Sequence, residues 1–331
     1  MWGWVSYHSL DRTEPRRGKV SSVFKKIRKA VRGPRPQYSL PGWSETRGYD
    51  LHLPPSHQRP MPLVIAIHGY TQDGRQMSSL TSPDGRADHP DSFNSLADAE
   101  GFAVAYPYGT RIKILPGRCW NAGGGINGYA PVGDPARRHN VDDVGFFEDL
   151  FSDITKRCSI DLKRVYLMGI SNGGAMAQRL AVENPQPWAA IATVSACNQY
   201  SAALNRVPQT PMPLIHIHGT EDKVWPYLGK DLRPLGRLES VDSSFQTWLH
   251  TNQAELLGDE ILPAQTSEDP TRIRVQTYRG RCDTELFTVQ GGGHTWPSGF
   301  QYLPPRLVGV VSRQMSANTT IWEFFKRHRR D

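Results

Sequence analysis

Ser171 lies in a Gly-Ile-Ser-Asn-Gly pattern at residues 169–173, which can present a serine hydroxyl as a nucleophile. The residues before it, 165–168, are apolar and include a β-branched and an aromatic side chain, which predicts a buried strand. The residues after it, 175–181, are good helix formers. A glycine-flanked serine between a strand and a helix is typical of a nucleophile elbow, whose sharp turn exposes the hydroxyl. An ordinary glycine-rich turn is the alternative, so the interpretation depends on partner residues elsewhere in the chain.

An activated serine needs a base that accepts its proton and an acid that orients this base. After an elbow these partners follow in the order Asp or Glu, then His. Asp222 follows the apolar segment 213–218, and Glu221 beside it is the alternative acid. We prefer Asp222 because it begins the turn Asp-Lys-Val-Trp-Pro-Tyr. His294 follows the predicted strand 285–289 and a run of glycines, and it alone among the eleven histidines occupies the slot after a strand that follows the acid.

The negative charge of a tetrahedral intermediate must be stabilised by hydrogen-bond donors, usually backbone N–H groups. One donor is expected to be the amide of the residue after the nucleophile, here Asn172. The other comes from the loop after an early strand. The apolar segment 62–67 is followed by His68 and Gly69, so we predict the Tyr70 amide as the second donor, with Thr71 as the next choice.

These residues need a scaffold, and apolar strand segments alternate along the chain with helix-forming segments. This alternation predicts a mostly parallel, doubly wound α/β sheet with helices on both faces. Apolar residues at helical spacing follow Val141-Asp142-Asp143, and we expect these aspartates to cap that helix rather than to do chemistry. Further helices are expected around Phe245, Trp248 and Leu249 and over residues 319–328.

Several motifs together resemble the esterase family that contains polyhydroxybutyrate depolymerase-like enzymes and microbial feruloyl esterases, within the α/β-hydrolases. The matching stretches are residues 68–72 (HGYTQ), 102–110 (FAVAYPYGT), 119–121 (CWN), 141–146 (VDDVGF), 169–173 (GISNG), 218–222 (HGTED) and 292–297 (GGHTWP). They occur in family order, so the set is specific although each member is weak. The resemblance implies an α/β-hydrolase fold, hydrolysis of carboxylic esters through Ser171, His294 and Asp222, and no metal or organic cofactor.

We therefore expect a serine carboxylic-ester hydrolase that forms an acyl-enzyme and resembles polyhydroxybutyrate depolymerases, with hydroxyalkanoate esters or oligomers as substrates. A feruloyl or acetyl esterase acting on plant polysaccharide esters is the closest alternative, and a peptidase is a weaker one. No polymer-binding module or Ser/Thr/Pro-rich linker is visible, which favours a small or oligomeric ester. A binding protein on a hydrolase fold is the alternative of another class. Its expected mark is a lost triad member, and all three residues are present.

Four residues are candidates for contacting the substrate. Thr71 follows Tyr70, Trp120 lies on a glycine-rich loop, and Trp225 and Trp296 lie beside the proposed acid and base. The tryptophans could form an aromatic wall, but packing inside the protein explains them equally well.

The formal net charge of +7 is concentrated in the first 40 residues, which hold ten of the 39 Lys and Arg and two of the 32 Asp and Glu. This arm carries +8, so residues 41–331 carry −1, and nucleic-acid binding has no support. Val20, Val23, Phe24, Ile27 and Val31 recur at helical spacing within the arm. The arm could form an amphipathic helix that contacts an anionic membrane, but we favour packing on the body or disorder.

Residues 41–331 are expected to form a single catalytic domain. No run of about 18 apolar residues predicts a transmembrane helix. The resemblance suggests a secreted or periplasmic protein, although the first residues lack the apolar core and cleavage site of a signal peptide, so localisation stays open. The four cysteines permit two disulfides, and we favour pairing Cys119 with Cys158 because each flanks an element near the elbow strand.

Overall fold

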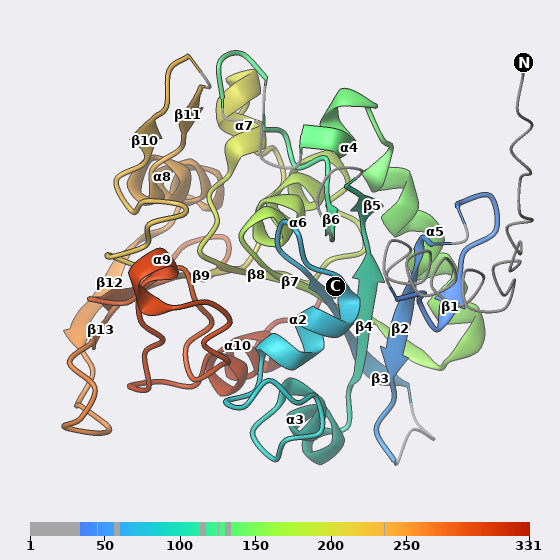
Figure 1. The fold of residues 1–331 in the computed structure, drawn as a ribbon, viewed down its shortest axis with the longest axis horizontal. Helices are drawn as coiled ribbons and strands as arrows, with labels where there is room; N and C mark the ends of the chain where they lie inside the picture. The colour runs from blue at the N-terminus through green and yellow to red at the C-terminus, as the bar shows by residue number, and fades with distance from the viewer. Residues whose placement is uncertain are drawn as a thin grey trace, which may run out of the picture. The chain divides into compact units, whose positions relative to one another are not determined.

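The computed structural model describes residues 34–331, apart from residues 45, 56–59, 113–116, 125, 130–133 and 235. The predicted amphipathic helix of the arm lies outside the described residues. Residues 35–331 form one compact unit (Figure 1). The short strand β1 (Tyr38–Ser39) pairs with β2 (Gly48–His52), so the last residues of the predicted arm contribute to the sheet. The division of the chain at residue 40 otherwise stays a prediction.

A ten-stranded sheet organises the fold, in the order β1-β2-β4-β3-β7-β8-β9-β14-β13-β12. Beyond β1 and β2, these strands are β3 (Met61–Ile67), β4 (Ala103–Tyr108), β7 (Ile160–Ile170), β8 (Ala190–Val194), β9 (Leu214–Gly219), β12 (Glu255–Ile261), β13 (Arg272–Arg279) and β14 (Thr284–Gln290). The six strands from β4 to β14 run parallel, and the two strands added at each edge are antiparallel. The predicted mostly parallel sheet is confirmed.

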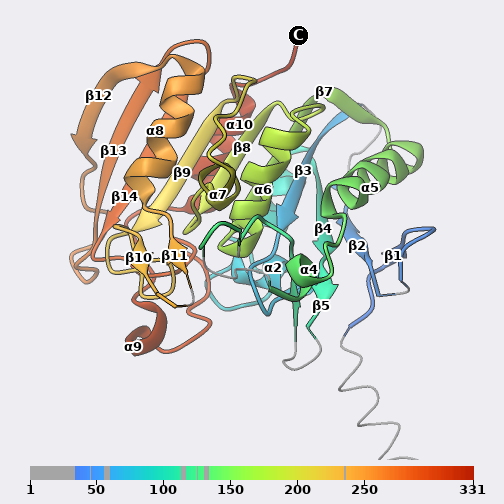
Figure 2. The ribbon, with the colours of Figure 1, turned by 90° about the horizontal axis from the view of Figure 1, so that it is seen from above.

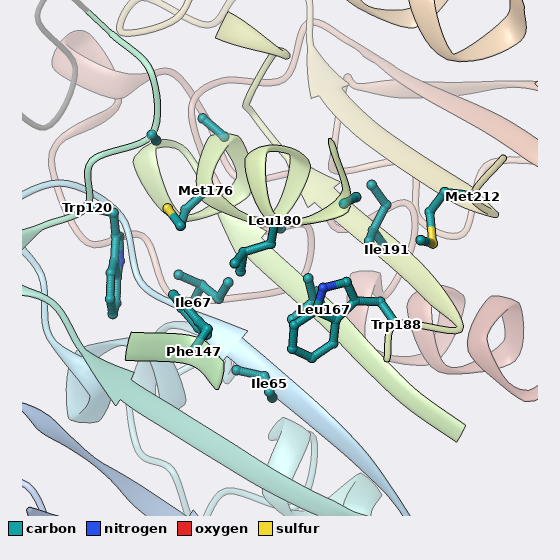
Figure 3. Close-up of a cluster of buried hydrophobic side chains, with 14 of the residues drawn as sticks. Ile65, Ile67, Trp120, Phe147, Leu167, Met176, Leu180, Trp188, Ile191 and Met212 are labelled. Atoms are coloured by element: carbon teal, nitrogen blue, oxygen red, sulfur yellow. The ribbon is translucent and has the colours of Figure 1, made fainter. Parts of the chain in front are cut away.

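Helices cover both faces of the sheet, because the central strands are apolar on both faces. In β3, Leu63 and Ile65 join one buried cluster while Val64 and Ala66 join the other. Helices α5 (Asp143–Arg157), α6 (Asn172–Glu183) and α8 (Val241–Asn252) pack on the first face (Figure 2). Helices α2 (Gly74–Leu80), α3 (Phe93–Glu100) and α10 (Ala317–Lys326) pack on the second. Figure 3 shows the first cluster, in which Leu180 of α6 lies against Ile67 and Leu167 of the sheet.

Smaller elements form the loops around this sandwich. They are β5 (Thr110–Arg111), β6 (Arg118–Cys119), α4 (Asp134–Arg138), α7 (Gln199–Leu204), β10 (Lys230–Asp231), β11 (Arg237–Leu238) and α9 (Pro305–Val308). Among the described residues, no helix is long and apolar enough to cross a bilayer.

The two aspartates at the start of α5 have different roles. Asp142 caps the helix as expected, since its side chain accepts a hydrogen bond from the Gly145 amide (2.9 Å). Asp143 is buried instead, where it pairs with the guanidinium of Arg47 (2.7 Å). The sequence prediction of capping therefore holds for the first aspartate and misses the ion pair of the second.

The favoured disulfide is wrong. All four cysteines are free thiols, with Cys119 buried and Cys158 partly buried. Cys119 lies in β6 and directs its sulfur toward the Thr110 carbonyl, whereas Cys158 ends α5. Proximity to the elbow strand in sequence did not place these two side chains together.

Candidate active site

The predicted site residues follow strands that end at the same edge of the sheet. β3, β7, β9 and β14 are all parallel, and the carboxyl ends of parallel strands form the usual ligand-binding edge of an open α/β sheet. Tyr70 follows β3, Ser171 follows β7, Asp222 follows β9 and His294 follows β14. Residues that are distant in sequence are therefore carried to one edge by the strand order.

Ser171 occupies a strained turn between β7 and α6. Its φ of 55° and ψ of −126° are unfavourable for a residue with a side chain. The turn is possible because Gly173 brings α6 very close to β3: a Cβ atom there would lie 2.2 Å from the Ile67 carbonyl oxygen. The Ser171 amide also donates to the Val194 carbonyl of β8 (2.9 Å). The predicted strand, elbow and helix are confirmed.

Asp222 and His294 form a buried, hydrogen-bonded pair. The distance from His294 Nδ1 to Asp222 Oδ2 is 2.7 Å, and both side chains are almost fully buried. Asp222 Oδ1 accepts hydrogen bonds from the amides of Val224 (2.8 Å) and Trp225 (2.7 Å). The carboxylate is thus held in one orientation by the backbone of its own loop.

The electrostatics of this pair favour an ionised carboxylate. Burial alone would raise the pKa of Asp222, but the electrostatic interaction with His294 and hydrogen bonds from His218 and His294 outweigh it and hold the pKa well below its usual range. An ionised Asp222 accepts a hydrogen bond from His294 Nδ1–H. The other ring nitrogen, Nε2, is then left to accept a proton, as a general base must.

A row of buried polar groups continues from Asp222 into the sheet, and sequence reasoning missed it. His218 Nε2 lies 2.8 Å from the Trp225 carbonyl oxygen and 3.4 Å from Asp222 Oδ2. His218 Nδ1 lies 3.3 Å from His216 Nε2, and His216 Nδ1 lies 2.7 Å from the Thr193 hydroxyl. Burial and the neighbouring His218 lower the pKa of His216 well below its usual value, so this imidazole is neutral. The alternation His-Ile-His in β9, which places both imidazoles on one sheet face, was the available signal.

Ser171 and His294 open onto one pocket of about 390 Å³. It is lined by Gly69, Tyr70, Thr71, Gln72, Gln76, Ser79, Leu80, Gly85, Ile170, Ser171, His294, Phe300, Tyr302 and Leu303. None of these described lining residues is Asp, Glu, Lys or Arg. Phe300, Tyr302 and Leu303 supply apolar surface, and Gln72 and Gln76 supply amides. The pocket therefore suits an uncharged ligand with both apolar and hydrogen-bonding parts.

Of the two predicted oxyanion donors, one belongs to a residue that lines this pocket and the other to a buried residue outside the lining. Tyr70 lines the pocket, and Asn172 is the first residue of α6, directly after Ser171. The amide of Thr71, the second choice, donates to the Arg118 carbonyl (2.9 Å). Thr71, like Tyr70, lines the pocket, and the choice of Tyr70 over Thr71 as a donor stays a prediction.

The three candidate tryptophans lie inside the protein and are not among the residues that line the pocket. Trp120, Trp225 and Trp296 are each at most 2% exposed. Their indole N–H groups donate to the His68 carbonyl, the Glu239 carbonyl and the Asn318 side chain, respectively. The structure thus gives them packing roles, and the aromatic residues at the pocket are the predicted Tyr70 together with Phe300 and Tyr302, two residues that sequence reasoning missed. No sequence motif marks those two residues.

The chain is similar in sequence to known esterases. Residues 47–207 match the sequence model of the family described as esterase PHB depolymerase. The protein named "Putative esterase NocK" from Nocardia uniformis subsp. tsuyamanensis is 29% identical over 295 residues, covering 84% of this chain and 79% of that protein. Feruloyl esterase D from Neurospora crassa is 25% identical over 256 residues, covering 72% of this chain and 79% of that protein.

A third relative and a solved structure agree with these matches. The bifunctional acetylxylan esterase/xylanase XynS20E from Neocallimastix patriciarum is 31% identical over 182 residues, which are 54% of this chain but 22% of that larger protein. The acetyl xylan esterase from Aspergillus awamori superposes with a TM-score of 0.50 at 18% identity, covering 85% of this chain and 94% of that chain. At this identity the likeness concerns the fold, which is that of the α/β-hydrolases.

Proposed function

We propose that Ser171 is the nucleophile of this chain, His294 its general base and Asp222 the acid that orients the base. The chain belongs, through residues 47–207, to the esterase PHB depolymerase family, and it is a serine carboxylic-ester hydrolase. The observation that carries this proposal is the buried Asp222–His294 pair (2.7 Å), since His294 lines the same pocket as the strained Ser171. Neither feature alone demands catalysis. Together they supply the nucleophile, base and orienting group of acyl transfer.

The proposed reaction proceeds in two halves. Ser171 Oγ attacks the ester carbonyl carbon while His294 Nε2 takes the hydroxyl proton, and the amides of Tyr70 and Asn172 donate to the resulting oxyanion. The intermediate then collapses, the bond to the alcohol breaks, and His294 gives its proton to the leaving alcohol. Water repeats the sequence on the acyl-enzyme: His294 takes its proton, the carboxylic acid is released, and Ser171 regains its proton.

For the substrate, we propose a neutral ester whose acyl group presents a flat apolar face, as in a feruloyl ester. Phe300 and Tyr302 support this proposal because they can stack on a planar ring, while Gln72 and Gln76 can hydrogen-bond to hydroxyl or ether oxygens. A pocket of about 390 Å³ has room for such a group. The names of relatives that include feruloyl esterases point the same way.

Hydroxyalkanoate oligomers are the second candidate, which the family match favours. The uncharged pocket lining predicts which ester bonds of such an oligomer the enzyme would cleave. A free carboxylate would find no Lys or Arg partner among the described lining residues, so internal ester bonds should be cleaved in preference to the one beside a free acid end.

Initial rates on a panel of neutral esters test both candidates. The panel holds p-nitrophenyl esters, methyl ferulate, acetylated xylan, and hydroxybutyrate trimer with a free or a methylated carboxyl end. A preference for methyl ferulate supports the first candidate, and a preference for the methylated trimer supports the second. Equal rates on both trimers would contradict the argument from the uncharged pocket. Ser171→Ala should abolish turnover of every ester, and retained turnover would refute the proposed nucleophile.

A further inference from the structure

Trp120 connects the two segments that carry the proposed oxyanion donors. Its indole Nε1–H donates to the carbonyl oxygen of His68 (3.0 Å), on the loop after β3. Its backbone N–H donates to Asn172 Oδ1 (2.7 Å), at the start of α6. Asn172 Nδ2 donates in return to the Trp120 carbonyl oxygen (3.1 Å). One buried residue therefore bonds to both segments by three hydrogen bonds.

These bonds lie close to the proposed donors. His68 is two residues before Tyr70, and Asn172 carries one donor on its own backbone. Both polar atoms of the Asn172 side chain form a hydrogen bond with Trp120, so rotation of this side chain would break two hydrogen bonds. The side chain of His68 is also held by a hydrogen bond, because its Nε2 accepts from the Gly109 amide (3.1 Å). Burial lowers the pKa of this imidazole to about 3, so the ring is neutral. The neutral ring is what this acceptor role requires.

Trp120 is itself immobilised from several sides. The residue is completely buried, and its ring lies 4.9 Å from the imidazole of His68 and 5.1 Å from the ring of Phe147, centroid to centroid. Trp120 and Phe147 are both labelled in Figure 3. The next residue, Asn121, donates its amide to Asp143 (2.6 Å). The Arg179 guanidinium donates to the Asn121 carbonyl oxygen. These contacts hold the Trp120 side chain in one position, so its hydrogen bonds can hold His68 and Asn172 in fixed positions as well.

We propose that Trp120 is a positioning residue that sets the separation of the Tyr70 and Asn172 amides, and so the geometry of the oxyanion hole. This inference rests on the proposed function of Ser171. Oxyanion donors must lie within hydrogen-bond distance of the place where the charge develops, not of the ground-state carbonyl oxygen. A displacement of about 1 Å can reduce a rate about 100-fold. Loss of the Trp120 bonds should therefore weaken transition-state binding more than substrate binding.

Trp120→Phe tests this by removing the indole N–H while keeping an aromatic ring. We expect kcat to fall roughly 10-fold to 100-fold with KM changed less than about threefold. A trifluoromethyl ketone matched to the best ester, which forms an anionic adduct with serine, should bind weaker by the same factor as kcat. The carboxylic acid product, which does not need the oxyanion hole, should bind unchanged.

Trp248→Phe is the matched control. Trp248 is also completely buried and donates its indole N–H to a single acceptor, Gln178 Oε1 (2.9 Å), away from the pocket lining. Both variants should lose similar thermal stability, and only Trp120→Phe should lose affinity for the ketone. If the two variants lose kcat equally, or if ketone and product affinities fall together, Trp120 has no positioning role.

Asn172→Ala provides a second test if Trp120→Phe does not fold. This variant removes both side-chain bonds to Trp120 but keeps the backbone amide that would donate to the oxyanion. It should reproduce the loss of kcat and of ketone affinity, and normal values would overturn the proposal. Ser171→Ala separates the two hypotheses. An active Ser171→Ala refutes the proposed nucleophile, whereas an inactive Ser171→Ala beside a normal Trp120→Phe refutes only the positioning role.

Discussion

Asp222→Asn is the sharpest test of the proposed triad, because the structure indicates what the new amide would do. The side-chain oxygen of the substituted residue could still accept from the amides of Val224 and Trp225, so the loop should keep its conformation. The new NH₂ group would replace Oδ2, which lies 2.7 Å from His294 Nδ1 and 3.4 Å from His218 Nε2. His218 Nε2 already faces the Trp225 carbonyl oxygen (2.8 Å) as a donor, so it is a poor acceptor.

The amide N–H would therefore donate to His294 Nδ1 and force the ring proton onto Nε2. That tautomer cannot accept the proton of Ser171, and the imidazolium that forms during attack would lose its anionic partner. For a buried triad this combination costs about 10⁴-fold in kcat, which corresponds to roughly 5–6 kcal/mol. The loss should be confined to kcat, since Asp222 does not line the pocket.

The assay is steady-state hydrolysis of a p-nitrophenyl ester at pH 7–8, with circular dichroism to verify folding. Glu221→Gln is the matched control, because Glu221 is the neighbouring, exposed carboxylate and the rival acid in the sequence. It should keep nearly full activity. If Asp222→Asn retains more than about a tenth of kcat, or if Glu221→Gln is the damaged variant, the assignment of the acid is refuted.

Three further perturbations follow from the packing around the site. Acidification from pH 6.5 to 5 should lower the free energy of unfolding, because burial lowers the pKa of His216 and the unfolded chain then binds a proton that the folded one does not. His216→Gln should reduce this slope, measured by urea unfolding, by about 1.4 kcal/mol per pH unit, and an unchanged slope would contradict the assignment. Gly219→Ala would place a Cβ atom 2.2 Å from the Gly292 carbonyl oxygen, so it should displace the His294 loop and lower kcat roughly 100-fold; a normal kcat would show that the loop adapts. Asp143→Asn should cost about 3–5 kcal/mol in chemical denaturation because it leaves the buried Arg47 charge without its anion, and a loss below about 1 kcal/mol would argue against a buried charge pair.

The sequence predicted the parts of the fold that depend on local pattern. Short apolar runs predicted the strands, such as the one that ends before Ser171. The glycines around Ser171 predicted a tight turn, and the structure shows that a side chain at Gly173 would collide with the backbone of β3. The order of Asp222 and His294 after the serine was enough to place both at the carboxyl edge of the sheet. Those inferences succeeded because strand ends and tight turns are specified by a few neighbouring residues.

The remaining features depend on packing between distant segments. Nothing near Trp120 or Trp225 indicates that their rings point into the interior, since a loop tryptophan serves equally well at a surface. Phe300 and Tyr302 reach the pocket because the long segment after β14 folds back over it. The ion pair of Arg47 with Asp143 likewise joins a residue directly before β2 to the first residue of α5. Such contacts are set by tertiary geometry, which leaves no local signature in the chain.

The strand order also has a consequence for how activity emerges during folding. Leu63 of β3 pairs with Val165 of β7, and Ile215 of β9 pairs with Glu285 of β14, so each pairing closes a long loop of chain. Loop closure of this kind is entropically unfavourable and slow. Ser171, with its unfavourable φ, follows β7, which pairs with β3 on one side and β8 on the other, and we expect these pairings to be needed to hold that conformation. A refolding chain should therefore regain its helical signal well before it regains esterase activity, and partly folded chains should carry an unreactive serine.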